Sequence, residues 1–202
     1  MDVRLIIDED FNEVENVIRE AFYNVYMPGC DEHLIVHKLK NDKCFVKDLS
    51  MVCLDEDKII GAILYGLCKL ENEEDEKEVL FFGPLGVLPS YQGLENGANL
   101  IFESLTKVKE KGYPFVLITG NPMYYTRFGF EPCSRYNIYL KGHNKNEEAN
   151  FFMIRVFDKE KMKYYSGEVS FPSIYEVNKD ELEEFEKNFP FKEKEVRDNH
   201  LR

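Results

Sequence analysis

The sequence predicts a single α/β domain, and two observations support this fold class. Short apolar segments with strand character alternate along the chain with segments whose apolar residues recur at helical spacing. The middle of the chain contains three such segments in succession: an apolar run at 78–89, an amphipathic segment at 96–113 and an apolar run at 114–119. This order is typical of a strand, a crossover helix and a second strand parallel to the first. No internal repeat and no linker rich in Gly, Ser or Pro divides the chain.

The first third of the chain predicts a strand, two helices and a hairpin. Residues 3–8 are short, apolar and β-branched, as in a strand, and residues 8–23 carry apolar side chains at helical spacing. A Pro-Gly pair at 28–29 ends this unit, and a second short helix follows at 31–40. Residues 49–70 contain two apolar stretches joined by the acidic "DEDK", which indicates the two strands of a hairpin.

The middle of the chain predicts the centre of the sheet. The acidic run at 71–77 has the composition of a solvated hairpin loop, and the apolar run at 78–89 is typical of a central strand that is covered on both faces. The helix at 96–113 is expected to stop at Gly112, and residues 114–119 form the next buried strand.

A short helix and two late strands follow. Asn121 can cap this helix, Pro122 suits its first position, and Gly129 ends it after about two turns. Residues 149–157 and 167–172 predict the late strands.

Composition and charge narrow the classes of partner. With 44% hydrophobic residues the chain is expected to form a folded core, and a net charge of −12 disfavours nucleic acid and anionic membranes while favouring cationic molecules or basic peptides. The 5 cysteines include no C-x-x-C pair and no zinc spacing, so we expect reduced thiols in a cytoplasmic protein and no metal site. Neither a signal peptide nor a membrane-spanning segment is indicated.

The turn between the strand at 78–89 and the helix at 96–113 is a candidate site for a phosphate group. Gly93 and Gly97 allow a ligand to approach the backbone, and the helix start offers N–H groups that lack helical acceptors. The turn lacks the spacing of a nucleoside triphosphate loop and of a dinucleotide site. Taken alone, it fits an ordinary connection between a strand and a helix equally well.

Tyr124 and Tyr125 form a second candidate site on the short helix that follows the next strand. Both sites lie at the carboxyl ends of neighbouring strands, where open α/β sheets bind ligands. A phenol at this position can donate a proton to a thiolate leaving group. The alternative is that both tyrosines are core aromatics with solvated hydroxyl groups.

Together the two stretches resemble the GNAT superfamily of N-acetyltransferases. "LGVLPSYQGLENGANLI" is similar to the acetyl-CoA loop of that superfamily, whose pattern is [QR]-x-x-G-x-[GA], and "YYTRFGF" is similar to its downstream Y-x-x-x-G-F element. More narrowly, "GNPMYYTRFGFEPCSRY" and "SGEVSFPSIYEV" resemble the YhbS-like group. The resemblance implies a GNAT-type fold over residues 1–175: a central, mixed, mostly antiparallel sheet that splays between its fourth and fifth strands and is flanked by helices. Residues 176–202 would then form a charged C-terminal helix and a frayed tail rather than a separate domain.

The resemblance also implies roles for particular residues. Tyr125 matches the tyrosine that protonates the departing CoA thiolate, and Asn121 lies where it can touch the cofactor arm. The other residues that match the acetyl-CoA site are Leu85, Gly86, Val87, Gln92, Gly93, Leu94, Glu95, Asn96, Gly97 and Ala98. The implied reaction is direct attack of a primary amine, from a small molecule or peptide, on the thioester. A backbone N–H near Val87 would hold the carbonyl oxygen, without a metal or a protein nucleophile. A homodimer is the default expectation for such proteins.

Glu95 departs from this pattern, because it stands where the pattern has its middle glycine. A carboxylate about 6 Å from one pyrophosphate charge would be repelled by roughly 3 kcal/mol, or about a hundredfold in affinity. A side chain that points into solvent would weaken binding far less. The alternative function is therefore a catalytically decayed GNAT-fold binding or regulatory module with a weakened CoA site.

The general base is left open by the sequence. Glu78 lies at the outer end of its strand, and Glu32, His33 and His37 lie on the second helix, where spacing puts the two histidines on one face. A base reached through water fits equally well.

Overall fold

The computed structural model describes residues 2–145 and 147–196. Met1 and the last part of the predicted charged tail, residues 197–202, lie outside the described residues. The helices are α1 (Phe11–Phe22), α2 (Glu32–Leu39), α3 (Asn96–Glu110), α4 (Pro122–Tyr125) and α5 (Lys179–Glu186). The strands are β1 (Asp2–Leu5), β2 (Met51–Asp55), β3 (Lys58–Glu71), β4 (Glu76–Val87), β5 (Phe115–Thr119), β6 (Glu131–Pro132), β7 (Ile138–Leu140), β8 (Phe152–Val156) and β9 (Gly167–Ser170).

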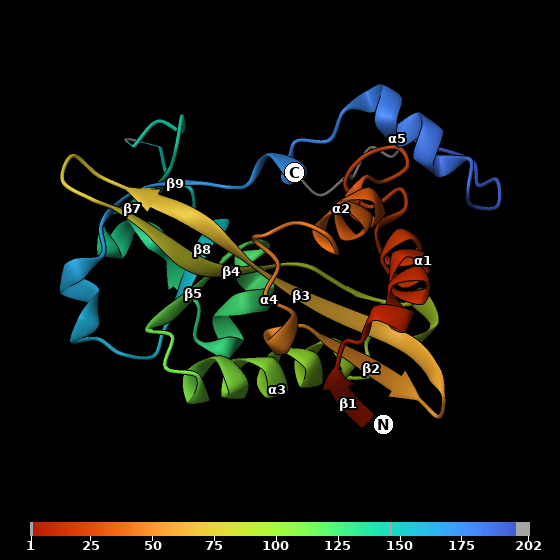
Figure 1. Ribbon diagram of the computed structural model, residues 1–202, viewed down its shortest axis with the longest axis horizontal. Helices are drawn as coiled ribbons and strands as arrows, with labels where there is room; N and C mark the ends of the chain where they lie inside the picture. The colour runs from red at the N-terminus through yellow and green to blue at the C-terminus, as the bar shows by residue number, and fades with distance from the viewer. Residues whose placement is uncertain (1, 146, 197–202) are drawn as a thin grey trace.

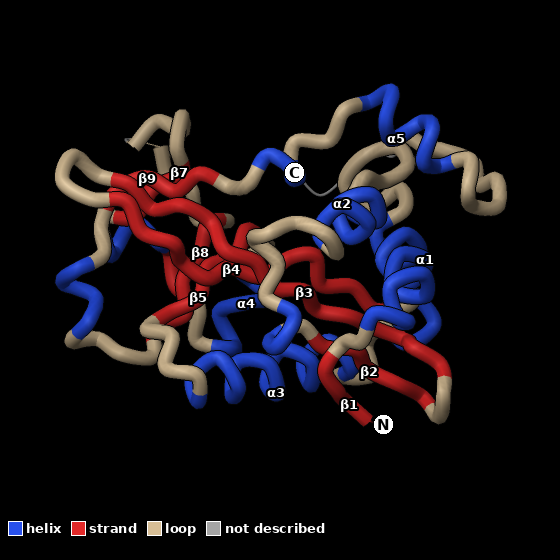
Figure 2. Tube along the Cα trace, in the orientation of Figure 1, coloured by secondary structure: helices blue, strands red, loops and turns tan. Residues whose placement is uncertain are grey.

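The strands form one mixed sheet in the order β1-β2-β3-β4-β5-β8-β6, with β9 paired to β3 and β7 paired to β9 (Figures 1 and 2). The β4–β5 and β7–β9 pairs are parallel, and the other pairs are antiparallel. The predicted fold class is therefore confirmed, including the parallel pair that α3 connects.

The sheet opens between β4 and β5. Their parallel ladder is registered at Phe81 and Leu117, whereas β4 continues alongside β3 as far as the pair of Val87 with Gly61. The register of β3 and β4 shifts at a cis peptide bond between Gly83 and Pro84. The last residues of β4 are thus paired with β3 on one edge only, which confirms the predicted splay and leaves the other edge available to a ligand.

Helices cover both faces of this sheet, with α1 and α2 on one face and α3 on the other (Figure 1). Side chains of β3 alternate between the two layers, because successive residues of a strand point to opposite faces. Leu64 packs in the α1 and α2 layer, whereas Ile63 and Tyr65 pack in the α3 layer. The Tyr65 hydroxyl donates a hydrogen bond to Ser104 Oγ of α3 at 2.8 Å, so this buried phenol has a polar partner.

The C-terminal segment contacts α1, α2 and the loop between them as far as Glu195. Arg19 of α1 donates to a Glu186 carboxylate oxygen at 2.9 Å. The hydroxyl of Tyr23 donates to the carbonyl of Lys192 at 2.7 Å. A frayed tail was expected, but these hydrogen bonds hold the described part of the tail in place. No helix among the described residues is long and apolar enough to cross a membrane.

Candidate active site

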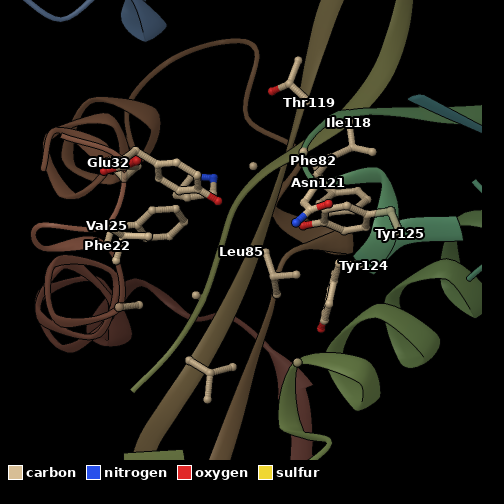
Figure 3. A pocket seen from close by; sticks show the side chains of 18 of the residues that line it. Phe22, Val25, Glu32, Phe82, Leu85, Ile118, Thr119, Asn121, Tyr124 and Tyr125 are labelled. Atoms are coloured by element: carbon tan, nitrogen blue, oxygen red, sulfur yellow. The ribbon is translucent and has the colours of Figure 1, made fainter. Parts of the chain in front are cut away.

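A cleft of about 1370 Å³ opens at the splay of the sheet. Its walls come from β4 and β5, from the starts of α3 and α4, and from α1 and α2 on the opposite side. Figure 3 shows Leu85 of β4 between two groups of side chains, Phe22, Val25 and Glu32 on one side and Asn121, Tyr124 and Tyr125 on the other. The cleft exceeds the roughly 300–1,000 Å³ of an ordinary small-molecule pocket, so it has room for two reactants.

Most of the site residues predicted from the sequence meet in this one cleft. The exception is Leu94, whose side chain is 60% exposed and does not line it. The predicted residues that do line the cleft are Leu85, Gly86, Val87, Gln92, Gly93, Glu95, Asn96, Gly97, Ala98, Asn121 and Tyr125.

The loop before α3 presents backbone donors at the cleft. The first helical hydrogen bond of α3 runs from the Asn99 N–H to the Glu95 carbonyl at 2.9 Å. The N–H groups of Asn96, Gly97 and Ala98 therefore have no acceptor within the helix. Such a helix start, with its partial positive charge, favours an anion.

One side-chain amide ties this loop to β4, and a second joins the start of α3 to the loop. Gln92 Nε2 donates to the carbonyl of Val87 at 2.9 Å, and Asn96 Nδ2 donates to the carbonyl of Tyr91 at 2.8 Å. Asn96 is only 1% exposed, and its Oδ1 is a buried acceptor without a hydrogen-bond partner in the described part of the chain.

The backbone of Glu95 explains why the superfamily pattern has glycine here. Its φ is +64°, in the left-handed region that glycine enters without a steric penalty. Because Glu95 adopts this conformation, the loop keeps the shape that a glycine would give it. The side chain is exposed and makes no hydrogen bond to the described residues. The departure from the pattern is therefore confined to one carboxylate beside the cleft.

Tyr125 is positioned by a capped turn that follows the predicted pattern. Asn121 Oδ1 accepts a hydrogen bond from the Met123 N–H at 2.9 Å, and Gly129 ends the turn with a φ of +78°. The ring of Tyr125 packs against Phe82 of β4, with the ring centroids 6.0 Å apart. Its hydroxyl makes no hydrogen bond to the described residues, so it can serve a ligand.

Burial raises the pKa of Tyr125, with smaller contributions from Tyr124, Tyr26 and Tyr65. The phenol therefore stays protonated throughout the physiological pH range. It can donate a hydrogen bond to a sulfur atom that gains negative charge, whereas complete transfer of its proton to a thiolate is disfavoured. The role expected from the sequence is thus better described as hydrogen-bond donation.

The candidates for a general base differ in whether their side chains line the cleft. Glu32 is half-buried and lines the cleft. His33 and His37 share one face of α2, as predicted, but both rings contact Phe185 of α5 rather than the cleft. Glu78 is exposed and lies outside the cleft. Glu32 is therefore the candidate with access to a bound substrate.

A buried cysteine and histidine come together behind α2 without forming a nucleophile. Cys30 Sγ lies 3.5 Å from His33 Nδ1, and His33 Nε2 lies 2.8 Å from a Glu186 oxygen. Cys30 is 4% exposed, His33 is fully buried, and burial raises the pKa of the Cys30 thiol. A thiol that is neither ionised nor accessible does not attack a substrate, so this group is structural. All 5 cysteines are free and buried.

Several cleft residues were missed by the sequence analysis. Phe22, Val25 and Tyr26 form a wall that only the packing of α1 reveals, and no local motif marks them. Arg127, by contrast, stands inside the "YYTRFGF" motif. Among the described residues that line the cleft, it is the one with a positive charge. No group of three or more potential metal ligands occurs among the described residues.

Comparison with known proteins assigns this fold and cleft to a family. The family model described as acetyltransferase (GNAT) domain matches residues 2–133. The chain therefore belongs to the GNAT acetyltransferase family.

Two curated relatives come from Escherichia coli strain K12. Uncharacterized N-acetyltransferase YjhQ is 33% identical over 100 residues, which cover 50% of this chain and 55% of YjhQ. Uncharacterized N-acetyltransferase YhbS is 27% identical over 136 residues, which cover 67% of this chain and 77% of YhbS. The match with YjhQ thus spans about half the length of that relative.

Two solved structures are similar across most of the chain. E. coli YhbS in complex with CoA has a TM-score of 0.74 and 21% identity, covering 87% of this chain and 92% of YhbS. A GNAT family acetyltransferase from Brucella melitensis in complex with acetyl-CoA has a TM-score of 0.68 and 24% identity, covering 86% of this chain and 97% of that protein. These similarities establish the fold.

Proposed function

We propose that the protein transfers an acetyl group from acetyl-CoA to a primary amine of a small molecule or peptide. The observation that carries this proposal is that the α3 loop and Tyr125 line the same cleft. That cleft lies beside the unpaired edge of β4. The family and the CoA complexes of its structural neighbours support this choice of co-substrate.

The cleft has the donors and acceptors that acetyl-CoA requires. The free N–H groups at the start of α3 suit the pyrophosphate, and Arg127 adds a cation. The open edge of β4 at Leu85 and Val87 suits the pantetheine amides, which can pair with it as a short strand does. These groups suit the pyrophosphate and the pantetheine arm of acetyl-CoA.

The chemistry needs no covalent enzyme intermediate. A neutral amine attacks the thioester carbon, and a backbone N–H near Val87 stabilises the negative charge that develops on the carbonyl oxygen. Tyr125 donates a hydrogen bond to the sulfur as the C–S bond breaks. The buried Cys30 takes no part, because it is closed off from the cleft.

Calorimetric titration with acetyl-CoA and with CoA tests the proposal. Micromolar binding would support it and exclude the alternative of a catalytically decayed module, whereas no binding at millimolar ligand would overturn it. Release of free thiol in the presence of a panel of amines then measures turnover.

The Tyr125→Phe variant tests the proposed role of the hydroxyl group. We expect kcat to fall by about one to three orders of magnitude with little change in acetyl-CoA affinity, because the ring is retained and only the donor is lost. Tyr164→Phe is the matched control, since Tyr164 is 62% exposed and lies outside the cleft. Equal losses of kcat and of acetyl-CoA affinity would show that Tyr125 acts only in packing.

A further inference from the structure

The wall of the cleft opposite Tyr125 combines apolar surface with negative charge. Phe22, Val25 and Tyr26 supply the apolar part, and the rings of Phe22 and Tyr26 lie 5.9 Å apart. Asp31 and Glu32 supply two carboxylates. None of the described residues in this wall carries a positive charge that would neutralise them. A Glu32 carboxylate oxygen accepts a hydrogen bond from the Asp31 N–H at 3.2 Å, so the carboxylate keeps acceptor capacity for a ligand. An apolar surface edged by carboxylates that lack a cationic partner suits a cation on a hydrophobic body.

Glu32 and Tyr125 line the same cleft. Burial raises the pKa of Tyr26 in the apolar wall, and the charge of Glu32 adds to this shift. Figure 3 shows Glu32 on the α2 side and Tyr125 on the α4 side, with Leu85 of β4 between them. A group bound over Leu85 therefore has a carboxylate on one side and a phenol on the other.

We propose that Glu32 accepts a proton from the ammonium group of the acceptor, and that the acceptor is a primary amine whose aromatic or aliphatic body packs on Phe22, Val25 and Tyr26. This proposal rests on the proposed acetyl transfer and names its base and its class of acceptor. The net negative charge of the protein favours cationic acceptor substrates in general. The proposal restricts these to amines that carry an apolar group.

The protons of the reaction balance with these two groups. The ammonium gives one proton to Glu32, and its nitrogen lone pair then forms the C–N bond to the acetyl carbon. The nitrogen loses a second proton as the C–S bond breaks. The sulfur, to which the Tyr125 hydroxyl donates a hydrogen bond, takes up this second proton, and the proton on Glu32 leaves to solvent. The products are the N-acetyl amine, CoA thiol and one released proton.

The surroundings of Glu32 suit this role. Burial raises the pKa of Glu32 to about 7, and Asp31 contributes to the same shift. The other titratable groups that interact with it are Cys30 and Tyr26. A base whose pKa lies near the working pH exists partly as carboxylate and still holds a proton well, which favours proton transfer.

The Glu32→Gln variant is the main test, with 2-phenylethylamine as acceptor. At neutral pH we expect kcat/KM for the amine to fall by about two to four orders of magnitude, while the KM for acetyl-CoA stays the same. Glu181→Gln is the control, because it removes the same charge from the surface partner of Lys38, outside the cleft. Glu32→Asp should keep part of the activity.

The pH profile separates a base from a structural residue. In the unmodified protein kcat/KM should rise up to about pH 7 and then level off, because the carboxylate is the active form. In Glu32→Gln the rate should instead keep rising toward the pKa of the amine, near about 10, because only the free amine reacts. Identical profiles, or a larger loss in Asp31→Asn than in Glu32→Gln, would overturn the role of Glu32.

Binding tests the acceptor class without turnover. Calorimetric titration of the CoA complex should show that 2-phenylethylamine binds at least about tenfold more tightly than ethylamine, and that Glu32→Gln weakens its binding. Equal affinities for the two amines, or no binding of either, would overturn the proposed acceptor site. Failure of CoA itself to bind would instead overturn the proposed acetyl transfer, so the two failures are distinguishable.

Discussion

The ring of Tyr125 lies against the backbone of Gly120, so closely that a Cβ atom at position 120 would lie 2.3 Å from Tyr125 Cε2. Gly120 follows β5, and its N–H donates to the carbonyl of Phe151 at 2.8 Å, which fixes its place beside the sheet. The absence of a side chain at position 120 is therefore what lets the phenol reach the cleft. This contact makes the orientation of Tyr125 testable without removal of its hydroxyl group.

The Gly120→Ala variant should displace Tyr125 and lower kcat by about a hundredfold, since a shift of about 1 Å in a catalytic group can cost this much. We expect a stability loss of about 1–3 kcal/mol from overpacking. Steady-state kinetics and thermal unfolding measure the two effects. In a Tyr125→Phe background the same alanine should lower kcat little further, because the hydroxyl is already gone. Full additivity of the two changes would contradict this interpretation.

The Glu95→Gly variant should bind CoA more tightly, by up to about a hundredfold if the carboxylate lies near the pyrophosphate. Glu56→Gly is the matched control. Glu56 also has a left-handed backbone, with a φ of +54°, but lies outside the cleft. Both variants remove the same backbone strain, of roughly 1–2 kcal/mol, so only the first should change CoA affinity in calorimetry. Unchanged affinity in Glu95→Gly would show that its carboxylate points away from the phosphates.

Local patterns predicted most of the fold, because the determining contacts lie close together in sequence. The hairpin turns, the spacing of apolar residues along α3 and the cap at Asn121 each involve residues a few positions apart. The predicted end at Gly129 is confirmed by its left-handed backbone. Such features follow from hydrophobic periodicity and turn chemistry, and both can be read from the chain.

Contacts between distant segments could not be predicted in this way. Spacing placed His33 and His37 on one face of α2, but it could not show that Phe185, about 150 residues later, covers this face. The choice of Glu32 among the candidate bases depends on that packing. The approach of α1 to β4 likewise depends on Gly86, where a Cβ atom would lie 2.8 Å from Ile18 Cδ1. An apolar residue in the sequence indicates that its side chain is buried, but it does not show which distant segment packs against it.

The Arg127→Ala variant should weaken CoA binding by about tenfold and reduce its dependence on salt, because a cation is removed from a cleft that binds a polyanion. The guanidinium lies over the ring of Tyr124, 4.3 Å from its centroid, so it is held at the cleft. Arg127→Lys should recover only part of the affinity, since the stacked planar group is lost. Arg135→Ala is the control, because Arg135 pairs with Glu131 on the surface. Equal CoA affinity in all four proteins would contradict the assignment.

His33 should make the packing of the C-terminal segment sensitive to acid. Burial lowers the pKa of His33 from its ordinary value of 6.5, although the nearby Glu186 partly opposes the shift. The unfolded chain therefore binds a proton more readily than the folded protein does. The stability that the neutral ring contributes is fully present above pH 6.5 and is lost as the pH falls from there through the lower pKa of the folded state.

The measurement is thermal unfolding at about pH 7.5 and about pH 5.5, in the unmodified protein and in His33→Gln. We expect the unmodified protein to lose more stability on acidification than the variant does, because glutamine does not titrate. His37→Gln is the control, since His37 lies on the same helix face but its side chain is 55% exposed.

Because burial also raises the pKa of Glu32, protonation of that carboxyl stabilises the fold as the pH falls through about 7. The Glu32 contribution is common to all three proteins and cancels in the comparison. Equal acid sensitivity of the unmodified protein and His33→Gln would exclude His33 as its source.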